Sequence, residues 1–464
     1  MQTFPKRATV MGLGRFGGGI GVTRFLASGG SKVLVTDIEA AEELGDSVAK
    51  IQDLIDSGLV ELRLGGHDER DFVHTDLVVA NAAVPRPWDN GYLLAAERAG
   101  VPVTTEIAMM IERLPAHTRE RTVAITGSAG KSTTTTMVHH ALRVLGEPSG
   151  LRAVLGGNIG ISLLETAHRL DSQTFVVLEL SSAQLYWMER VRKAAGRPQG
   201  FSPKVAVVTN ISPNHIDWHG SFDHYRDAKR DLIRFQSPAD TCVLGDSVWD
   251  WRGSTQASPV RIDPAAFPGH IKLPGDHNRL NAAAALAAVM AIMPGADPDA
   301  VRRAIAEFPG LAHRLQLVAQ APLRPGTDPV MFYNDSKSTT PDSCLKAIEA
   351  LEAMPGMRRG RIHLIAGGYD KGSDLTPVAR LASDLGGLYA IGATGPRIVS
   401  IAGGASGRVS DCGTLEHAIH TALPHLQPGD CLLLSPACAS WDQYVNFEAR
   451  GDEFVAIVNK AVQP

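Results

Sequence analysis

The chain has 464 residues, of which 44% are hydrophobic and 20% are charged, and its formal net charge is −4. At roughly 150 residues per domain this length indicates about three domains, and the lack of a basic excess argues against binding to nucleic-acid phosphates. The longest apolar run, from Ala282 to Met293, is too short to span a membrane, and no secretory signal segment opens the sequence. We therefore expect a cytoplasmic monomer that binds small molecules, without membrane insertion and without a nucleic-acid partner.

Short apolar strands alternate with helix-length segments along the chain, which is typical of parallel βαβ sheets. Polar breaks interrupt this pattern at 115–121 and at 308–314, and residues 320–328 are expected to form a loop. The sequence thus predicts an α/β protein of three domains: a Rossmann-like domain at 1–105, a central P-loop ATPase-like domain with a parallel sheet at 106–311, and a C-terminal Rossmann-like domain at 312–464.

A glycine-rich turn follows the first predicted strand, Ala8 to Met11. The turn Gly12-Leu-Gly14-Arg-Phe-Gly17 opens a helix expected to continue through Leu26, and a second strand leads to Asp37. Glycines in such a turn let the backbone approach a pyrophosphate at the helix N-terminus, and Asp37 has the spacing of an acid that accepts from a ribose hydroxyl. The pattern favours a nucleotide diphosphate site, although a tight turn without a ligand has the same sequence, and NAD is not distinguished from other nucleotides.

A second glycine turn follows the apolar strand predicted at 122–126. The segment Gly127-Ser-Ala-Gly-Lys131-Ser132-Thr133 then leads into a long helix that ends near Gly146. Successive backbone N–H groups in such a turn cradle phosphate oxygens, and the lysine adds a positive charge against the terminal phosphates. We expect the Ser132 hydroxyl to reach Mg²⁺.

Acidic and imidazole side chains follow the next two strands. One apolar strand ends at Glu179, and another leads to His215. An acid at the carboxyl end of a parallel strand beside a phosphate loop is well placed to hold Mg²⁺, although an exposed glutamate at a strand end would look the same. Because Mg²⁺ prefers oxygen, the residues alone do not favour His215 as a ligand, and His219 and His224 are interpreted as surface or packing residues.

Motifs along most of the chain resemble those of the Mur ligases, in the order of that family. The matching segments are Thr126–Thr133, Gly156–Gly160, Leu178–Ser182 with Gln184, Asn210–Asp217, Tyr225–Lys229, Gly275–Asn278 with Asn281, Gly310–Arg314 and Asn334–Thr339. The segment Leu434–Gln443, with Asn446–Glu448, is similar to the glutamate-adding members. The resemblance extends from about Ile125 to Phe454, and the first predicted domain matches less well.

The resemblance implies an ADP-forming ligase that adds glutamate to UDP-N-acetylmuramoyl-L-alanine, with ATP as a further substrate and Mg²⁺ as the metal. D-glutamate is the expected amino acid, and L-glutamate is left open. The implied catalytic residues are Lys131, Lys229, His215 and Glu179. The implied metal ligands are Ser132, Glu179, His215 and Lys229, the last as a carbamate.

Three further sets of residues follow from the same resemblance. ATP would be bound by Gly127, Ser128, Ala129, Gly130, Lys131, Ser132, Thr133, Asn278, Asn281, Arg314 and Asp335. The UDP-linked substrate would contact Gly14, Arg15, Phe16, Asp37, Asn81, Asn158, Ser181 and Gln184. Glutamate would contact Thr339, Lys371, Ser440 and Phe447.

Three other functions compete with this interpretation. A NAD-dependent dehydrogenase would explain the turn at 12–17 and Asp37 but not the lysine-bearing loop at 127–133. A folate polyglutamylating ligase would explain that loop, but such enzymes lack an N-terminal glycine-turn domain like residues 1–105. A non-enzymatic nucleotide switch would hydrolyse ATP slowly without needing an amino acid.

Overall fold

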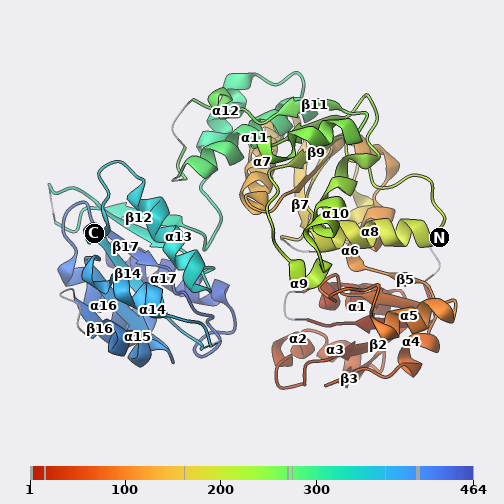
Figure 1. Cartoon of the computed structure of the whole chain (residues 1–464), viewed down its shortest axis with the longest axis horizontal. Helices are drawn as coiled ribbons and strands as arrows, with labels where there is room; N and C mark the ends of the chain where they lie inside the picture. Colours follow the sequence, from red (N-terminus) through yellow and green to blue (C-terminus); the bar gives the residue numbers. More distant parts are fainter. Residues whose placement is uncertain are drawn as a thin grey trace. The chain divides into compact units, whose positions relative to one another are not determined.

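The computed structural model describes residues 4–14, 17–160, 162–268, 271–273, 275–324, 326–370, 372–403 and 408–462. The chain divides into two compact units: Met1–Gly269 together with Leu280–Ala306, and His270–Arg279 together with Glu307–Pro464. The first unit contains two sheets and the second contains one. Each unit is an α/β structure built on mostly parallel strands, as the sequence predicted (Figure 1).

The first sheet is entirely parallel and has the strand order β3-β2-β1-β4-β5. Its strands are β1 (Arg7–Met11), β2 (Lys32–Asp37), β3 (Val60–Leu64), β4 (Leu77–Ala80) and β5 (Val103–Thr104). The helices that connect them are α1 (Gly18–Ser28), α2 (Gly45–Ala49), α3 (Gln52–Asp56), α4 (Arg70–Val73) and α5 (Gly91–Arg98). Two local predictions for this region are confirmed: the chain passes from β1 to α1 after Met11, and the second strand, β2, ends at Asp37.

The second sheet is also parallel and has the order β11-β10-β9-β6-β8-β7. Its strands are β6 (Thr122–Thr126), β7 (Arg152–Gly157), β8 (Thr174–Glu179), β9 (Val205–Val208), β10 (Thr241–Leu244) and β11 (Ser258–Arg261). Its helices are α6 (Glu106–Arg113), α7 (Lys131–Gly146), α8 (Ser182–Ala194), α9 (Ile216–His219), α10 (Phe222–Arg234), α11 (Asp276–Ile292) and α12 (Pro298–Ala306). Every residue of β6, β8 and β9 is buried, which explains their continuous apolar sequences, because helices cover both faces of such a sheet.

The third sheet lies in the second unit and has the order β12-β13-β17-β14-β15-β16. Its strands are β12 (Gln316–Ala321), β13 (Val330–Asn334), β14 (Ile362–Gly367), β15 (Gly387–Ile391), β16 (Val409–Gly413) and β17 (Cys431–Leu434). Its helices are α13 (Pro341–Glu352), α14 (Thr376–Ala379), α15 (Gly395–Ala402), α16 (Leu415–Ala422) and α17 (Phe447–Val462).

Alternate residues of the third sheet enter different hydrophobic clusters. Leu364 and Leu433 pack in one cluster with residues of α13, α14 and α15, whereas Ile365 and Leu432 pack in another with residues of α16 and α17. Successive side chains of a strand point to opposite faces, so helices cover both faces of this sheet as well.

The prediction of a loop over 320–328 is wrong at its start. Gln320 and Ala321 belong to β12, which pairs antiparallel with β13 opposite Met331 and Val330. The polar break at 115–121 also contains regular structure, because Ala116–Arg121 forms the 3-10 helix η1. The strand β12 depends on a tertiary contact, since its partner β13 supplies the hydrogen bonds of the pair.

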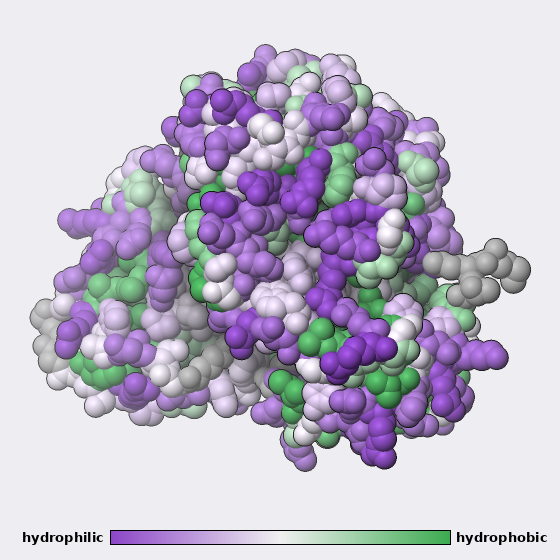
Figure 2. All heavy atoms as spheres, turned by 45° about the vertical axis from the view of Figure 1, so that its right-hand side comes forward, coloured by the Kyte–Doolittle hydropathy of each residue, from purple (hydrophilic) through white to green (hydrophobic). Residues whose placement is uncertain are grey.

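Among the described residues, no helix combines the length and apolar character needed to cross a membrane. Hydrophilic residues are spread over most of the face visible in Figure 2, with smaller hydrophobic areas between them.

Candidate active site

The phosphate loop joins β6 to α7 and depends on two glycines. Gly127 has a φ of 152°, and a Cβ atom there would lie 1.9 Å from Thr209 Oγ1. Gly130 has a φ of 79°, and a Cβ atom there would lie 2.2 Å from Asn281 Oδ1. Only glycine fits positions that combine a positive φ with such close neighbours. The second contact places Asn281, predicted to bind ATP, directly against the loop.

Asn210, two residues after the end of β9, forms hydrogen bonds with the middle of the loop. Its side-chain oxygen accepts from the Ala129 N–H at 2.9 Å, its side-chain nitrogen donates to the Ala129 carbonyl at 3.0 Å, and its own carbonyl accepts from the Ser128 N–H at 3.0 Å. These loop amides are thus bonded within the protein. The first-turn amides of α7, from Lys131 to Thr133, have no acceptor within the helix, and a helix start of this kind can bind an anion.

Two lysines donate to the same carbonyl oxygen in this loop. Lys131 Nζ lies 3.0 Å from Gly127 O, and Lys229 Nζ lies 2.8 Å from the same atom. Lys229 on α10 is fully buried and lies over the Tyr225 ring. Burial, followed by the charge of Lys131, lowers the pKa of Lys229 to about 6, against the opposing effect of Glu179. Its amine is therefore mostly neutral at pH 7.

Glu179 ends β8 with one oxygen bonded and one available. Oε1 accepts from the side-chain amide of Asn158 at 2.8 Å, and the carboxylate is almost fully buried. Oε2 is buried as well and has no hydrogen-bond partner among the described residues. A buried carboxylate oxygen without a partner is costly, and a divalent cation would satisfy it.

His215 precedes α9 in the left-handed conformation, with a φ of 51°. Partial removal from water, followed by the positive charges of Lys131 and Lys229, lowers its pKa below the usual value. A neutral imidazole can bind a metal. No group of three or more His, Cys, Asp or Glu side chains in the described part of the chain forms a ready metal site. Mg²⁺ often takes few protein ligands and completes its shell with water and phosphate, so the predicted donors Ser132, Glu179 and His215 do not require such a group.

Ser181 and Gln184, predicted to contact the UDP-linked substrate, form the N-terminal cap of α8. The Ser181 hydroxyl accepts from the Gln184 N–H at 3.2 Å, and the Gln184 side chain accepts from the Ser181 N–H at 3.0 Å. Asn158, another member of that set, is the residue that holds Glu179. All three therefore have a structural role beside the predicted one.

The turn after β1 brings the other predicted substrate residues together. The Gly14 N–H donates to Asp37 Oδ2 at 3.2 Å, and Asp37 Oδ1 accepts from the Glu39 N–H at 3.0 Å. The Asn81 side chain approaches the Gly12 carbonyl at 3.4 Å. Asp37 thus organises the turn through backbone bonds. Arg15 and Phe16 lie outside the described residues.

Asp335 in the second unit is buried with a perturbed charge. Burial raises its pKa to about 7, although Ser435, the Leu315 N–H and the charge of Arg314 oppose that rise. The Ser435 hydroxyl donates to Asp335 Oδ2 at 2.8 Å. Asn278, in the first turn of α11, is also buried. Asp335 therefore titrates well above the usual range of a carboxyl group.

The predicted glutamate residues lie on loops around the third sheet. Ser440 is buried, and its hydroxyl has no hydrogen-bond partner among the described residues. Phe447 begins α17, and its ring lies 5.3 Å from Lys337 Nζ. Thr339 is half-buried just before Thr340, which caps α13. Lys371 lies outside the described residues.

A cavity of about 1020 Å³ in the first unit is separate from this site. Phe25, Leu77, Val103, Met109 and Arg190 contribute to its lining. None of the predicted site residues lines it, and Leu77 and Val103 are at the amino ends of their strands. Ligands of parallel sheets bind at the carboxyl ends, so the loop at 127–133 and its neighbours remain the candidate active site.

Two family models match separate parts of the chain. A family model described as the Mur ligase middle domain matches residues 125–262, and one described as the Mur ligase glutamate ligase domain matches residues 313–438. The chain belongs to the Mur ligase family.

Relatives over the whole length share one name. The UDP-N-acetylmuramoylalanine--D-glutamate ligase of Symbiobacterium thermophilum is 35% identical, over 98% of this chain and 98% of its own length. The ligase of the same name from Streptococcus sanguinis is 33% identical, over 97% and 96%.

Solved structures show the fold. MurF from Acinetobacter baumannii matches with a TM-score of 0.53 and 16% identity, over 97% of this chain and 93% of its own. E. coli FolC matches with a TM-score of 0.50 and 17% identity, over 76% and 93%. At these identities the fold alone does not separate one amide ligase from another.

Proposed function

We propose that this ligase joins glutamate to UDP-N-acetylmuramoyl-L-alanine, with conversion of ATP to ADP and phosphate, as a step in peptidoglycan precursor synthesis. The observation that carries the proposal is the unpartnered Glu179 oxygen beside a loop where Lys131 and Lys229 share one carbonyl. Full-length relatives named for this reaction support the substrates. Their names specify D-glutamate, and we propose the same enantiomer here.

The chemistry starts from a carboxylate, which is a poor acyl donor. An oxygen of the alanyl carboxylate attacks the γ-phosphorus of ATP, and the bond to ADP breaks. The glutamate amine then attacks the acyl-phosphate carbonyl carbon, loses a proton and expels phosphate. Lys131 and the first amides of α7 would stabilise the charge that develops on the transferred phosphoryl group.

Glu179, His215 and Ser132 would hold Mg²⁺, which supplies electrostatic stabilisation of the phosphoryl oxygens when bound. The orphaned Glu179 oxygen and the lowered pKa of His215 support this assignment. Asn158 would keep Glu179 oriented toward the ion through its hydrogen bond.

Lys229 would act as a carbamate. Its neutral amine nitrogen attacks the carbon of CO₂ and loses one proton, which converts a potential cation into an anion. The lowered pKa of Lys229 favours this reaction, because only the unprotonated amine is nucleophilic. The resulting anion would face Lys131 and bind a second Mg²⁺.

Three domains would divide these tasks. Residues 1–105 would bind the UDP-linked substrate, residues 106–311 would bind ATP and the metal, and residues 312–464 would bind glutamate. Asn278, Asn281, Arg314 and Asp335 would complete the ATP site, and Thr339, Lys371, Ser440 and Phe447 would hold glutamate. The unpartnered hydroxyl of Ser440 supports its role as a donor to a substrate carboxylate.

Phosphate release in the presence of ATP, Mg²⁺ and UDP-N-acetylmuramoyl-L-alanine tests the proposal, with D-glutamate, L-glutamate and other amino acids compared. We expect release only when both the nucleotide substrate and D-glutamate are present. Turnover with L-glutamate alone would keep the ligase assignment and reverse the enantiomer. No ADP with either enantiomer, together with a nicotinamide absorbance change, would replace the ligase by a dehydrogenase.

A further inference from the structure

His219 makes several side-chain contacts near the candidate metal residues, although it is not among them. It lies at the end of α9 and is 2% exposed. Its Nε2 lies 2.9 Å from the Ser182 hydroxyl, and its Nδ1 lies 2.8 Å from His224 Nδ1. A neutral imidazole donates at one nitrogen and accepts at the other, so both contacts can be hydrogen bonds at once.

The two segments that carry Glu179 and His215 meet at this imidazole. Ser182 is buried in the first turn of α8, three residues after Glu179. The His219 N–H also donates to the His215 carbonyl at 2.9 Å. The side-chain bond to Ser182 therefore ties the segment of one proposed ligand to the segment of the other.

His219 also contacts Tyr225, which in turn contacts the phosphate loop. Its ring lies 5.3 Å from the Tyr225 ring in an edge-to-face arrangement. The Tyr225 hydroxyl lies 2.9 Å from the Ser128 hydroxyl, and its ring lies beneath Lys229 Nζ. A displaced His219 would thus disturb the loop as well as the two proposed ligands.

The second nitrogen of His219 leads toward the first sheet. His224 lies with its ring centroid 4.5 Å from that of Trp88, which lies in the loop between β4 and α5. Trp88 also contacts Trp218, the neighbour of His219 in α9. The imidazole therefore has two contacts, one toward the proposed metal ligands through Ser182 and one toward the first sheet through His224.

We propose that His219 is a positioning residue that fixes the spacing of Glu179 and His215 through Ser182, and so sets the affinity for the divalent cation that accompanies ATP. This inference rests on the proposed function in one respect, the assignment of Glu179 and His215 as metal ligands. Residues that orient metal ligands typically change metal affinity by about 10- to 100-fold when they are replaced.

Two substitutions separate the two nitrogens. In His219→Gln the side-chain amide reaches the place of Nε2 and keeps a partner for Ser182, whereas in His219→Asn it reaches the place of Nδ1 and keeps a partner for His224. We expect His219→Asn to weaken binding of Mn²⁺ by about tenfold, and His219→Gln to stay near wild type. His224→Phe, which keeps the ring against Trp88, is the matched control and should leave Mn²⁺ affinity unchanged.

The measurement is a titration of free Mn²⁺ by electron paramagnetic resonance, using the full-length protein with a non-hydrolysable ATP analogue. Ser182→Ala, which removes only a hydroxyl, should match His219→Asn, and the double variant should show no additional loss. Equal Mn²⁺ affinity in the Asn, Gln and wild-type proteins would overturn the proposal. Because the titration needs neither glutamate nor the UDP-linked substrate, a failed ligase assay would leave its result unaffected.

Discussion

At the scale of single residues, the unusual chemistry is concentrated at one end of the second sheet. Lys229 is buried and mostly neutral, Glu179 has an oxygen without a partner, and His215 is biased toward its neutral form. Perturbed groups gathered in this way identify a candidate functional site. The same reasoning identifies Asp335 in the second unit, where burial alone would favour the protonated form.

Replacement of Lys229 tests the carbamate directly. Lys229→Ala removes the amine, and Lys229→Arg keeps a cation that cannot form a carbamate. We expect both to lower kcat by on the order of 100-fold, and added bicarbonate should not restore either variant. The carbamate carbon should give a ¹³C signal after labelling with bicarbonate in the wild-type protein only.

The lowered pKa of Lys229 determines how the carbamate and the activity depend on pH. As the pH falls through about 6, Lys229 becomes protonated, so the carbamate signal and activity should decline together. Lys193→Ala, at a largely exposed side chain paired with Glu189 on α8, is the control and should retain activity. Full activity in Lys229→Arg would reject the carbamate.

At the scale of elements, the start of α8 combines a structural role with a proposed substrate contact. The capping box of Ser181 and Gln184 satisfies amide groups that the first turn would otherwise leave without acceptors. Because β8 and α8 are separated only by Leu180 and Ser181, the cap also fixes how the chain leaves Glu179. Ser221 caps α10 in the same manner, by accepting from the His224 N–H, but it belongs to no predicted set.

Substitutions of Ser181 separate the two roles. Ser181→Ala should lower stability by about 1 kcal/mol, whereas Ser181→Asn should keep the cap and lose little. If Ser181 also contacts the UDP-linked substrate, both variants should raise its KM, because neither keeps the hydroxyl. Ser221→Ala should show a similar loss of thermal stability with an unchanged KM. A KM for Ser181→Asn equal to that of wild type would assign Ser181 to capping alone.

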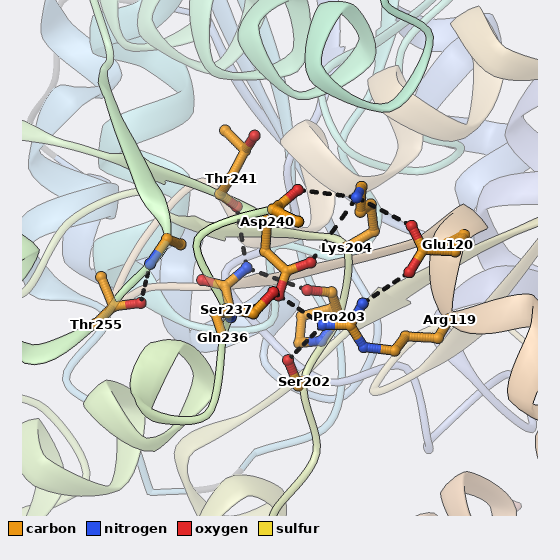
Figure 3. A network of polar contacts seen from close by, with 12 residues as sticks. Arg119, Glu120, Ser202, Pro203, Lys204, Gln236, Ser237, Asp240, Thr241 and Thr255 are labelled. Atoms are coloured by element: carbon orange, nitrogen blue, oxygen red, sulfur yellow. Dashed lines mark hydrogen bonds and ion pairs between the residues drawn. The ribbon is translucent and has the colours of Figure 1, made fainter.

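At the scale of the whole molecule, the two ends of the second sheet differ: a polar network lies at the amino ends of its strands, and the candidate active site lies at the carboxyl ends. A network at the amino ends of its strands joins η1, the start of β9 and the start of β10 (Figure 3). Arg119 lies 2.5 Å from Asp240 Oδ2, and Lys204 lies 2.9 Å from Glu120. The phosphate loop and Glu179 lie at the carboxyl ends of the same strands. We therefore expect substitutions in this network to change stability and to leave activity unchanged.

Asp240 is the buried centre of that network. Burial would raise its pKa, but the Ser237 N–H and hydroxyl together with Arg119 lower it overall. A carboxyl group whose pKa is lowered on folding stabilises the protein above its unfolded pKa of about 3.9, and that stabilisation is lost as the pH falls through its lower folded value.

Asp240→Asn should therefore reduce the free energy of unfolding at pH 7 by about 2 kcal/mol. This loss is smaller than for a fully buried ion pair, because Arg119 is partly exposed. The difference in melting temperature from wild type should shrink as the pH falls below 4. Glu120→Gln, at an exposed neighbour, should change stability by less than half as much. Because the network is remote from the loop, kcat at 25 °C should be unchanged, and a lowered kcat would contradict this separation.

The sequence by itself determined the class of fold, the family and the chemistry-bearing turns of the first and second sheets. Periodic apolar strands, glycines beside a lysine and an acid at a strand end are local patterns, and backbone sterics give them the same consequence in any parallel sheet. The glycine at 127 and the acid at 179 were singled out from such local patterns, although the sequence left open that Glu179 is an exposed residue at a strand end.

The tertiary structure alone decided what surrounds those patterns. Three features depend on segments far apart in sequence: the hydrogen bonds of Asn210 to the loop, the contact between Ser182 and His219, and the burial of Lys229. Burial shifts the pKa of Lys229 only once those segments pack. The strand at 316–321 was missed in part for the same reason, because its partner β13 supplies the hydrogen bonds that make it a strand. The spacing of residues along the sequence determines which of them share a helix or strand. Tertiary packing determines which of them are removed from water and which come into contact.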